Sequence, residues 1–360
     1  MLRMRVSREH HCEEAVRPEE ARFLRRLEGF PKSLIEPFET AQKARLLRAN
    51  GFLTLNNITL AINSRYRYSQ LNKSKGDNMN RNRMLFSSLF IIFSLFPIIN
   101  FSWNATGHKV IAKIAYDHLN PDARNTVDSL VHDMNQQYPY IKNFSDLAVW
   151  PDLIRRQKIE TYAHWHYIDI PFSTDGTRLK NVMTTDNALW AVNKMLPIVK
   201  NKKANRYERS RFLAFYSHIV SDLHQPLHTV TYVSEEMKNG DRGGNAYHVV
   251  YRNKKDNLHH IWDNGVGVFE ISDTNENIEH LANQLAAQYS EDSFGEKINQ
   301  LKPSDWTTEG MLNAKRYVYA TPIGEVVSDD YIQKGKSIAE QQAVIAGYRL
   351  AKLLNQLLGS

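Results

Sequence analysis

Pairs of His and Asp residues at helical spacing are the part of this sequence that can do chemistry. His218 and Asp222 stand four apart in the segment FYSHIVSDLHQPLH, and His259 and Asp263 repeat that spacing in NLHHIWD. Residues four apart lie on one face of a helix, so each pair can direct an imidazole and a carboxylate toward the same point. Both groups are ligands that zinc accepts in proteins.

Further candidate ligands are spread along the chain. His228 follows the proline of HQPLH, where the helix must end or bend, so its side chain can turn back toward the first pair. Asp152 lies in AVWPD and His166 lies in HWHYID, while His108 follows Trp103 by five residues. A single His–Asp pair is more often an ordinary hydrogen bond than a pair of ligands. Several such clusters in one chain favour a metal centre.

The composition narrows the classes of function. The chain has 360 residues, of which 42% are hydrophobic and 24% charged, as in an ordinary globular protein. Cys12 is the only cysteine, so no disulfide can form within the chain and a metal site must use His, Asp and Glu. Residues 1–83 hold 17 Lys and Arg against 9 Asp and Glu, so they account for the net charge of +7. The remainder carries −1, which argues against a large basic surface that tracks phosphates.

Residues 84–102, MLFSSLFIIFSLFPIINFS, have the pattern of a signal peptide. Arg81 and Arg83 precede the apolar run, and the small polar Ser102 closes it. The alternative is a transmembrane anchor, because the run approaches the ~18 apolar residues that can span a bilayer. Cleavage after Ser102 predicts a secreted or periplasmic protein without stable membrane association.

The 83 residues before this leader have no clear periodicity and no cluster of chemical groups. Because a signal peptide stands at the start of a chain, we interpret residues 1–83 as a mis-assigned upstream or disordered extension, with Met84 as the real start. A small extra domain is the alternative. Residues 103–360 then form the functional domain, whose length is typical of a single domain.

The elements that must position the candidate ligands are predicted to be mainly helices. Asn120 and Pro121 are a typical N-cap and first helical residue. Apolar periodicity predicts helices over residues 106–119, 121–131, 143–156, 185–200, 207–223, 276–289, 304–319 and 328–358, with a break in the last near 334–336. Residues 247–251 are typical of a strand, and residues 253–257 of a hairpin turn. The predicted fold is all-α, a single mainly helical domain with one small β-hairpin.

Six strings of the sequence, taken in order, resemble one known family. They are WNATGH, WPD, HYID, H-x3-D-x-HQPLH, GGN and NLHHIWD, and they run from Trp103 to Asp263. They resemble the three-zinc, single-strand-specific nucleases (the S-one/P-one nucleases), which are related to bacterial zinc phospholipase C. The resemblance implies the phospholipase C and nuclease type of helical fold.

The resemblance also implies three Zn²⁺ ions per chain and their ligands. One zinc ion would be held by Asp152, His166, His218 and Asp222. A second would be held by His228, His259 and Asp263. A third would be held by Trp103, through its free α-amino group and carbonyl, together with His108 and the bridging Asp222. A closely spaced pair of zinc ions activates water at neutral pH.

Four further roles follow from the same resemblance. Arg155, three residues after Asp152, matches an arginine that neutralises phosphate. Asp169 matches an acid near the scissile phosphate and the nucleophile. Tyr167 matches an aromatic residue of the nucleotide pocket, and Asn245 of GGN is a candidate for contact with substrate. From the residues alone, Gly243-Gly244-Asn245 is a tight turn rather than a phosphate-binding loop.

The function implied is hydrolysis of single-stranded DNA and RNA to 5′-mononucleotides, with a 3′-nucleotidase activity, by a monomeric secreted enzyme. The alternatives are a zinc phospholipase C and a non-catalytic zinc-binding protein. The phospholipase branch is characterised by a final H-x3-E pair and by a longer gap between the N-terminal Trp and its first His. This chain instead has an H-x3-D pair and a step of five residues from Trp103 to His108, which argues against a phospholipase. Among the other histidines, His224 is six residues from His218, so it is expected to point away from that pair.

Overall fold

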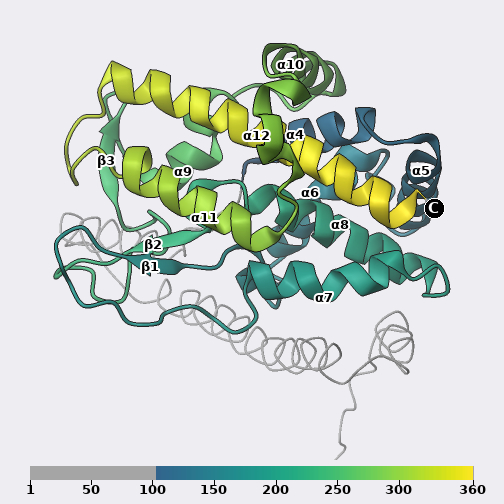
Figure 1. Cartoon of the computed structure of the whole chain (residues 1–360), viewed down its shortest axis with the longest axis horizontal. Helices are drawn as coiled ribbons and strands as arrows, with labels where there is room; N and C mark the ends of the chain where they lie inside the picture. Colours follow the sequence, from purple (N-terminus) through teal and green to yellow (C-terminus); the bar gives the residue numbers. More distant parts are fainter. Residues whose placement is uncertain (1–102, 360) are drawn as a thin grey trace, which may run out of the picture. The chain divides into compact units, whose positions relative to one another are not determined.

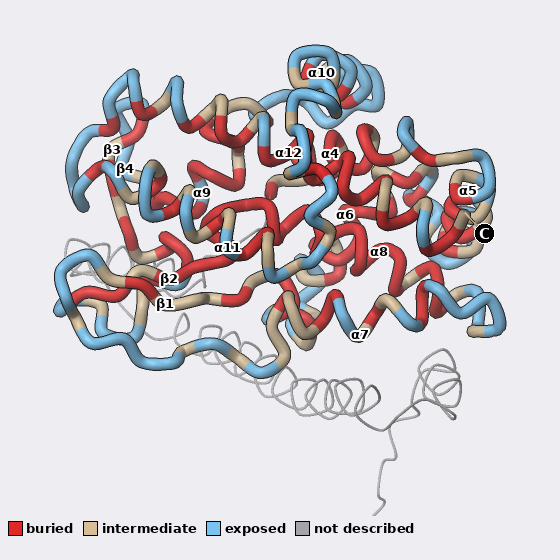
Figure 2. The backbone as a smooth tube through the Cα atoms, viewed as in Figure 1, coloured by how far each residue is buried: buried red, intermediate tan, exposed pale blue. Residues whose placement is uncertain are grey.

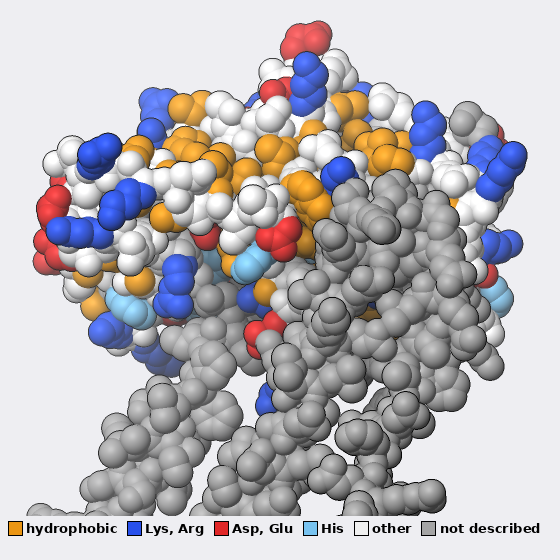
Figure 3. Space-filling model, turned by 90° about the horizontal axis from the view of Figure 1, so that it is seen from below, with side chains coloured by type: hydrophobic (Ala, Val, Ile, Leu, Met, Phe, Trp, Pro, Cys, Tyr) orange, Lys and Arg blue, Asp and Glu red, His pale blue; other side chains and the backbone are white. Residues whose placement is uncertain are grey.

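The computed structural model describes residues 103–359, which form a mainly helical domain (Figure 1). The predicted leader, residues 84–102, and residues 1–83 lie outside the described residues. None of the described helices combines the length and the hydrophobicity needed to cross a bilayer. On the face shown in Figure 3, the visible Lys and Arg side chains are interspersed with Asp and Glu, in keeping with the near-neutral charge after residue 83.

Helix α8 (Arg206–Asp222) is the centre of the domain. Almost every residue from Glu208 to Asp222 is buried, and helices α4 (Ala105–Asp117), α5 (Pro121–Asn135), α6 (Phe144–Arg156), α7 (Ala188–Lys200) and α12 (Asp329–Leu358) pack around it (Figure 2). A helix that is buried on all sides belongs to the core of a domain. Polar side chains on α8 therefore lie in the interior and need polar or ionic partners there.

Helix α12 extends across the domain and packs against α4. The two backbones come close together at Gly347, where an added Cβ would lie 2.6 Å from Ile114 Cγ2. Val110 and Ile114 of α4 join Val344 of α12 and Ile278 of α10 (Asn275–Gln288) in one hydrophobic cluster. The cluster fixes α4, which carries His108, against the C-terminal part of the domain.

Asparagine caps begin several of these helices as the sequence predicts. The Asn120 side chain accepts a hydrogen bond from Ala123 N at 2.8 Å, and Pro121 is the first residue of α5. The predicted helices are found, with ends that differ by a few residues. Two details differ from the prediction. Helix α12 is continuous through residues 334–336, and α11 (Pro303–Asn313) passes into a π-helical turn (Ala314–Val318).

Two small sheets complete the fold. The predicted hairpin is confirmed as β3 (His248–Tyr251) paired antiparallel with β4 (Lys254–Asn257). A second sheet, β1 (Ile170–Phe172) paired parallel with β2 (Val230–Tyr232), was not predicted, because three-residue strands carry no periodic signal. This parallel pair places the segment after Asp169 beside the segment after His228. The sheet therefore positions two candidate site residues.

Candidate metal centre

The candidate ligands come from six separate elements and meet in the interior of the domain. The contributing elements are α4, α6, α8, α9 (Leu258–Asp263) and two short 3-10 helices, η1 (Ala163–His166) and η2 (Pro226–His228). Their His and Asp side chains form three groups, in each of which the donor atoms lie within 4.8 Å of one another. The groups are His108–His218–Asp222, Asp152–His166–His218 and His228–His259–Asp263. All of these side chains are buried.

The group around His166 and His218 has the spacing of a tetrahedral metal site. The His166 Nδ1 atom lies 2.9 Å from His218 Nε2, 3.1 Å from Asp222 Oδ2 and 3.8 Å from Asp152 Oδ1. Ligand atoms about 2.0 Å from a tetrahedral zinc ion are roughly 3.3 Å apart. The separations among His166, His218 and Asp152, and those of Asp222 from both imidazoles, are close to that value.

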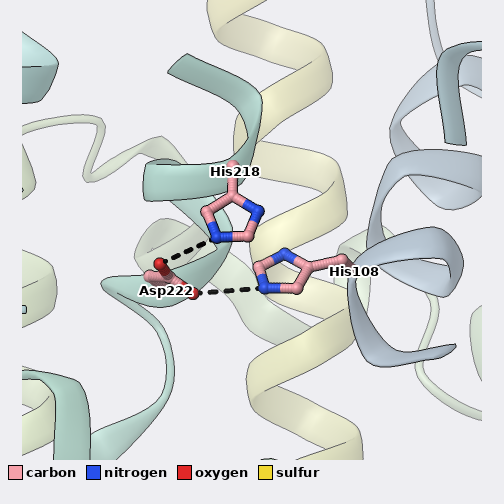
Figure 4. A group of neighbouring side chains, drawn as sticks. All are labelled: His108, His218 and Asp222. Carbon is pink, nitrogen blue, oxygen red and sulfur yellow. Dashed lines mark ion pairs between the residues drawn. The ribbon is translucent and has the colours of Figure 1, made fainter. Parts of the chain in front are cut away.

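Asp222 connects this group to the others through its two oxygens. Oδ2 lies 3.3 Å from His218 Nε2, while Oδ1 lies 3.3 Å from His108 Nε2 and 3.7 Å from His228 Nδ1. Figure 4 shows the carboxylate between His218, from α8, and His108, from α4. Each oxygen thus faces a different set of imidazoles, which is the arrangement of a bridging carboxylate.

The last group is built around Asp263. His228 Nε2 lies 3.4 Å from Asp263 Oδ1, and His259 Nε2 lies 3.4 Å from Asp263 Oδ2. Gln225 Nε2 also donates a hydrogen bond to Asp263 Oδ1 at 2.7 Å, which holds the carboxylate in place. Sequence reasoning did not single out Gln225, although it is part of the HQPLH string.

Backbone carbonyls orient three of the imidazole rings. The Nδ1 atoms of His218, His228 and His259 lie 2.8, 2.7 and 2.6 Å from the carbonyl oxygens of Ala148, His166 and Gly243. A carbonyl oxygen only accepts, so each Nδ1 carries the proton and each Nε2 of a neutral ring presents a lone pair to the centre. In metal-binding histidines the ring nitrogen that faces away from the metal typically donates to such a carbonyl, which fixes the orientation of the ring.

The electrostatics of the centre also fit bound cations. Burial would raise the pKa of the Asp222 carboxyl, but the surrounding His218 and His228 lower it well below its ordinary value. Burial lowers the pKa of His166 to about 4. Asp222 Oδ1 and His228 Nε2 are buried without a hydrogen-bond partner. Burial lowers the pKa of His228, but the Asp222 and Asp263 carboxylates raise it to about 9. Ionised carboxylates among imidazoles, with ligand atoms that have no hydrogen-bond partner, are a set of groups that divalent cations satisfy.

Comparison with known proteins decides which family this centre belongs to. The family model described as S1/P1 Nuclease matches residues 103–359. The chain belongs to the S1/P1 nuclease family. It is 28% identical to Endonuclease 1 of Arabidopsis thaliana, over 71% of this chain and 87% of that protein. It is 24% identical to Nuclease S1 of Aspergillus oryzae (71% and 92%) and 23% identical to Nuclease P1 of Penicillium citrinum (72% and 98%).

Family membership makes this chain a nuclease, a hydrolase of phosphodiester bonds, and confirms the helical nuclease fold predicted from the strings. In this nuclease, Trp103 is fully buried at the edge of the centre. Its indole Nε1 donates to Ser221 O at 3.0 Å, and Asn104 N donates to Asp263 O at 2.9 Å. The residue predicted to begin the mature chain therefore lies between the two helices that carry Asp222 and Asp263.

The residues expected to act on substrate lie near one another beside the centre. Asp169 precedes β1 with a left-handed backbone (φ +54°), and burial, followed by the charge of Asp241, raises its pKa to about 7. Burial and Asp169 raise the pKa of Tyr167, while the charges of Arg155 and Arg242 act in the opposite direction. Arg155 makes no ion pair within residues 103–359.

Two residues have surroundings that refine their expected roles. Asn245 donates through Nδ2 to Arg242 O at 2.7 Å, so in this structure its amide holds the turn of GGN together. His224 points away from the centre, and its Nε2 lies 3.0 Å from Arg349 Nη1 of α12.

Asp241 and Arg242 were not singled out from the sequence, because they belong to no His–Asp pattern.

Proposed function

We propose that this nuclease is a zinc-dependent phosphodiesterase that hydrolyses single-stranded DNA and RNA to 5′-mononucleotides and also acts as a 3′-nucleotidase. The observation that carries the proposal is the bridging position of Asp222 between three groups of buried His and Asp side chains. The near-neutral surface supports a site that holds one or two nucleotides, because such a surface offers no long track for a duplex.

The proposed ligands are the His and Asp side chains of the three groups, together with Trp103. One zinc ion would bind Asp152, His166, His218 and Asp222, and a second would bind His228, His259 and Asp263. A third would bind His108, Asp222 and the α-amino group and carbonyl of Trp103. When bound, zinc ions supply Lewis acidity and lower the pKa of water toward neutrality.

The side chains around the centre would then bind and orient the substrate. The Arg155 guanidinium offsets the negative charge that develops on the phosphoryl oxygens. The Asp169 carboxyl would hold or release a proton near the nucleophile. The Tyr167 ring offers an aromatic face against which a base can stack.

We further propose that residues 103–360 are the mature enzyme and that residues 84–102 are a leader removed after Ser102. The protein would then be secreted or periplasmic and monomeric. The position of Trp103 supports this boundary, because its indole and the next backbone nitrogen are hydrogen-bonded to the segments that carry two candidate ligands.

The deciding experiment compares substrates and metal content. The mature protein is assayed on denatured DNA, duplex DNA and phosphatidylcholine, with and without a chelator, and its zinc content is measured. Chelator-sensitive degradation of denatured DNA with three zinc ions per chain is expected. Preferential hydrolysis of phosphatidylcholine would favour a phospholipase, and zinc binding without hydrolysis would favour a binding protein. One zinc ion or none would contradict the proposed centre.

A further inference from the structure

A turn beside the metal centre holds an arginine in an unusual backbone conformation. Arg242 has a φ of +59°, in the left-handed region that residues other than glycine rarely adopt. The next residue, Gly243, provides the carbonyl oxygen that accepts the hydrogen bond from His259 Nδ1. The arginine is therefore one residue away from the group that orients a candidate ligand.

Hydrogen bonds fix this turn to strand β2. Arg242 N donates to Thr231 Oγ1 at 3.0 Å, and Arg242 O accepts from Asn245 Nδ2 at 2.7 Å. The fully buried Asp241 carboxylate accepts from the Tyr319 hydroxyl at 2.8 Å. Strained backbone persists where its surroundings hold it in place, and it is concentrated at functional sites. The base of the Arg242 side chain consequently has a defined position relative to β2.

Through strand β2, the Arg242 turn lies close to the residues proposed to act on substrate. Thr231 pairs with Pro171 of β1, two residues after Asp169. The charge of Arg242 acts on both Asp169 and Tyr167, in each case against the larger effect of burial on their pKa values. Arg242 itself is exposed and has no ion-pair partner in the part of the chain that the structure describes. A solvent-accessible guanidinium thus lies at the edge of the site.

We propose that Arg242 binds a phosphate of the substrate adjacent to the scissile one. A guanidinium pairs well with a phosphate, and Arg155 already serves the scissile phosphate in the function proposed above. This inference rests on that function and specifies its substrate class. The preferred substrates are strands or nucleotides with at least two phosphates.

The test compares substrates that differ by one phosphate. The zinc-loaded enzyme is given the dinucleoside monophosphate of thymidine and the same molecule with a phosphate added at its 5′ or its 3′ end. We expect the added phosphate at one end to raise kcat/KM. In the Arg242→Gly variant this advantage should fall about tenfold, the effect of one lost charge-assisted hydrogen bond. Glycine accepts the left-handed backbone, so the turn is retained.

Two further variants separate the charge from the backbone. Arg242→Lys keeps a cation and should retain part of the phosphate advantage. Arg252→Gly is the matched control, because Arg252 is also exposed and left-handed (φ +48°) but lies on the β3–β4 turn beside Glu270. The control should keep the whole advantage. On an oligothymidylate, Arg242→Gly should also reduce the slope of log kcat/KM against log salt by about 0.7, the share of one phosphate on a single strand.

Three outcomes would overturn the inference. An Arg242→Gly variant that keeps the phosphate advantage and the salt slope would show that Arg242 binds no phosphate. An equal loss on the dinucleoside monophosphate with and without the added phosphate, with an unchanged salt slope, would show that the guanidinium contacts the nucleoside part of the substrate instead. Absence of hydrolysis of every substrate by the wild-type holoenzyme would overturn the proposed function itself, and this inference with it.

Discussion

At the scale of single residues, Asp222 is the side chain on which the candidate centre depends most. Its two oxygens lie within 3.1–3.7 Å of nitrogens of His166, His218, His108 and His228. An ionised carboxylate can accept from several directions through two oxygens, whereas a neutral imidazole offers one lone pair. Loss of Asp222 should therefore affect more than one metal position.

The first prediction is that Asp222→Asn abolishes nuclease activity and removes more zinc than His228→Ala or His259→Ala. Asparagine keeps the size of the side chain but replaces one negatively charged oxygen with an amide nitrogen, which cannot bind a cation. Zinc content per chain and turnover on denatured DNA are the measurements. Full zinc occupancy with near-normal turnover in Asp222→Asn would contradict the bridging role.

The second prediction concerns Arg155. We expect Arg155→Ala to keep its zinc content but to lower kcat by roughly 10²-fold, the scale observed when a transition-state donor is removed. Arg156→Ala is the matched control, because the adjacent residue lies on a different face of the helix and is exposed. If Arg156→Ala is the damaging change and Arg155→Ala is silent, the assignment is wrong by one residue.

At the scale of elements, the Gly243–Asn245 turn orients a candidate ligand, because the Gly243 carbonyl accepts the hydrogen bond from His259 Nδ1. Gly243 has a φ of +60°, and an added Cβ would lie 2.3 Å from Leu227 O, which is backbone next to His228. A side chain at this position would therefore push the turn away from η2. The Gly243 carbonyl would then no longer meet His259 Nδ1.

The third prediction is that Gly243→Ala lowers both the melting temperature and the zinc content. Gly176→Ala is the control, because Gly176 also has a left-handed φ (+83°) but has no atom within 4 Å of an added Cβ. Left-handed backbone alone costs an alanine about 1–2 kcal/mol, which both variants share. A further loss of stability and of zinc is expected only in Gly243→Ala, measured by calorimetry and metal analysis. Equal effects in the two variants would show that the clash does not reach His259.

Sequence patterns predicted the long elements and the His–Asp pairs because both depend on local spacing. The i, i+4 spacing of His218 and Asp222 places both on one face of α8. The N-cap of α5 is a hydrogen bond between Asn120 and Ala123, residues only three apart in the sequence. The parallel pairing of β1 with β2 joins segments about sixty residues apart in three-residue strands, so no periodicity revealed it. Arg242 was missed for the same reason, since its place depends on a contact with Thr231 of β2.

At the scale of the whole molecule, Trp103, where we propose that the mature chain starts, is part of the proposed centre. Trp103 is fully buried, and the segment after it is hydrogen-bonded to Asp263. An α-amino group has a pKa of about 7.7–8, so it can give up its proton to a metal near neutral pH. An amide nitrogen within a continuous chain is a very poor ligand. Leader cleavage would therefore complete the third zinc site.

The fourth prediction compares two N-termini. A protein that starts at Trp103 should bind three zinc ions and be active, whereas the same protein with one additional N-terminal Gly should bind fewer zinc ions and lose most of its activity. Both proteins are purified unfolded and refolded by the same protocol with zinc in excess, which controls for differences in expression and processing. Equal zinc content and equal activity would show that the amine is not a ligand.

The buried contact between α8 and α12 has a consequence for how the protein is made. His224, two residues after Asp222, meets Arg349, which is fully buried and paired with Glu309 at 2.7 Å. Every candidate ligand has been synthesised once the chain reaches Asp263, but the helix that packs against α4 and α8 is made only with residues 329–358. A nascent chain thus presents its histidines and aspartates long before they have fixed positions. Metal binding at fixed geometry is therefore expected only after α12 has been made and packed, so the compartment where folding finishes would determine which ion is available to the centre.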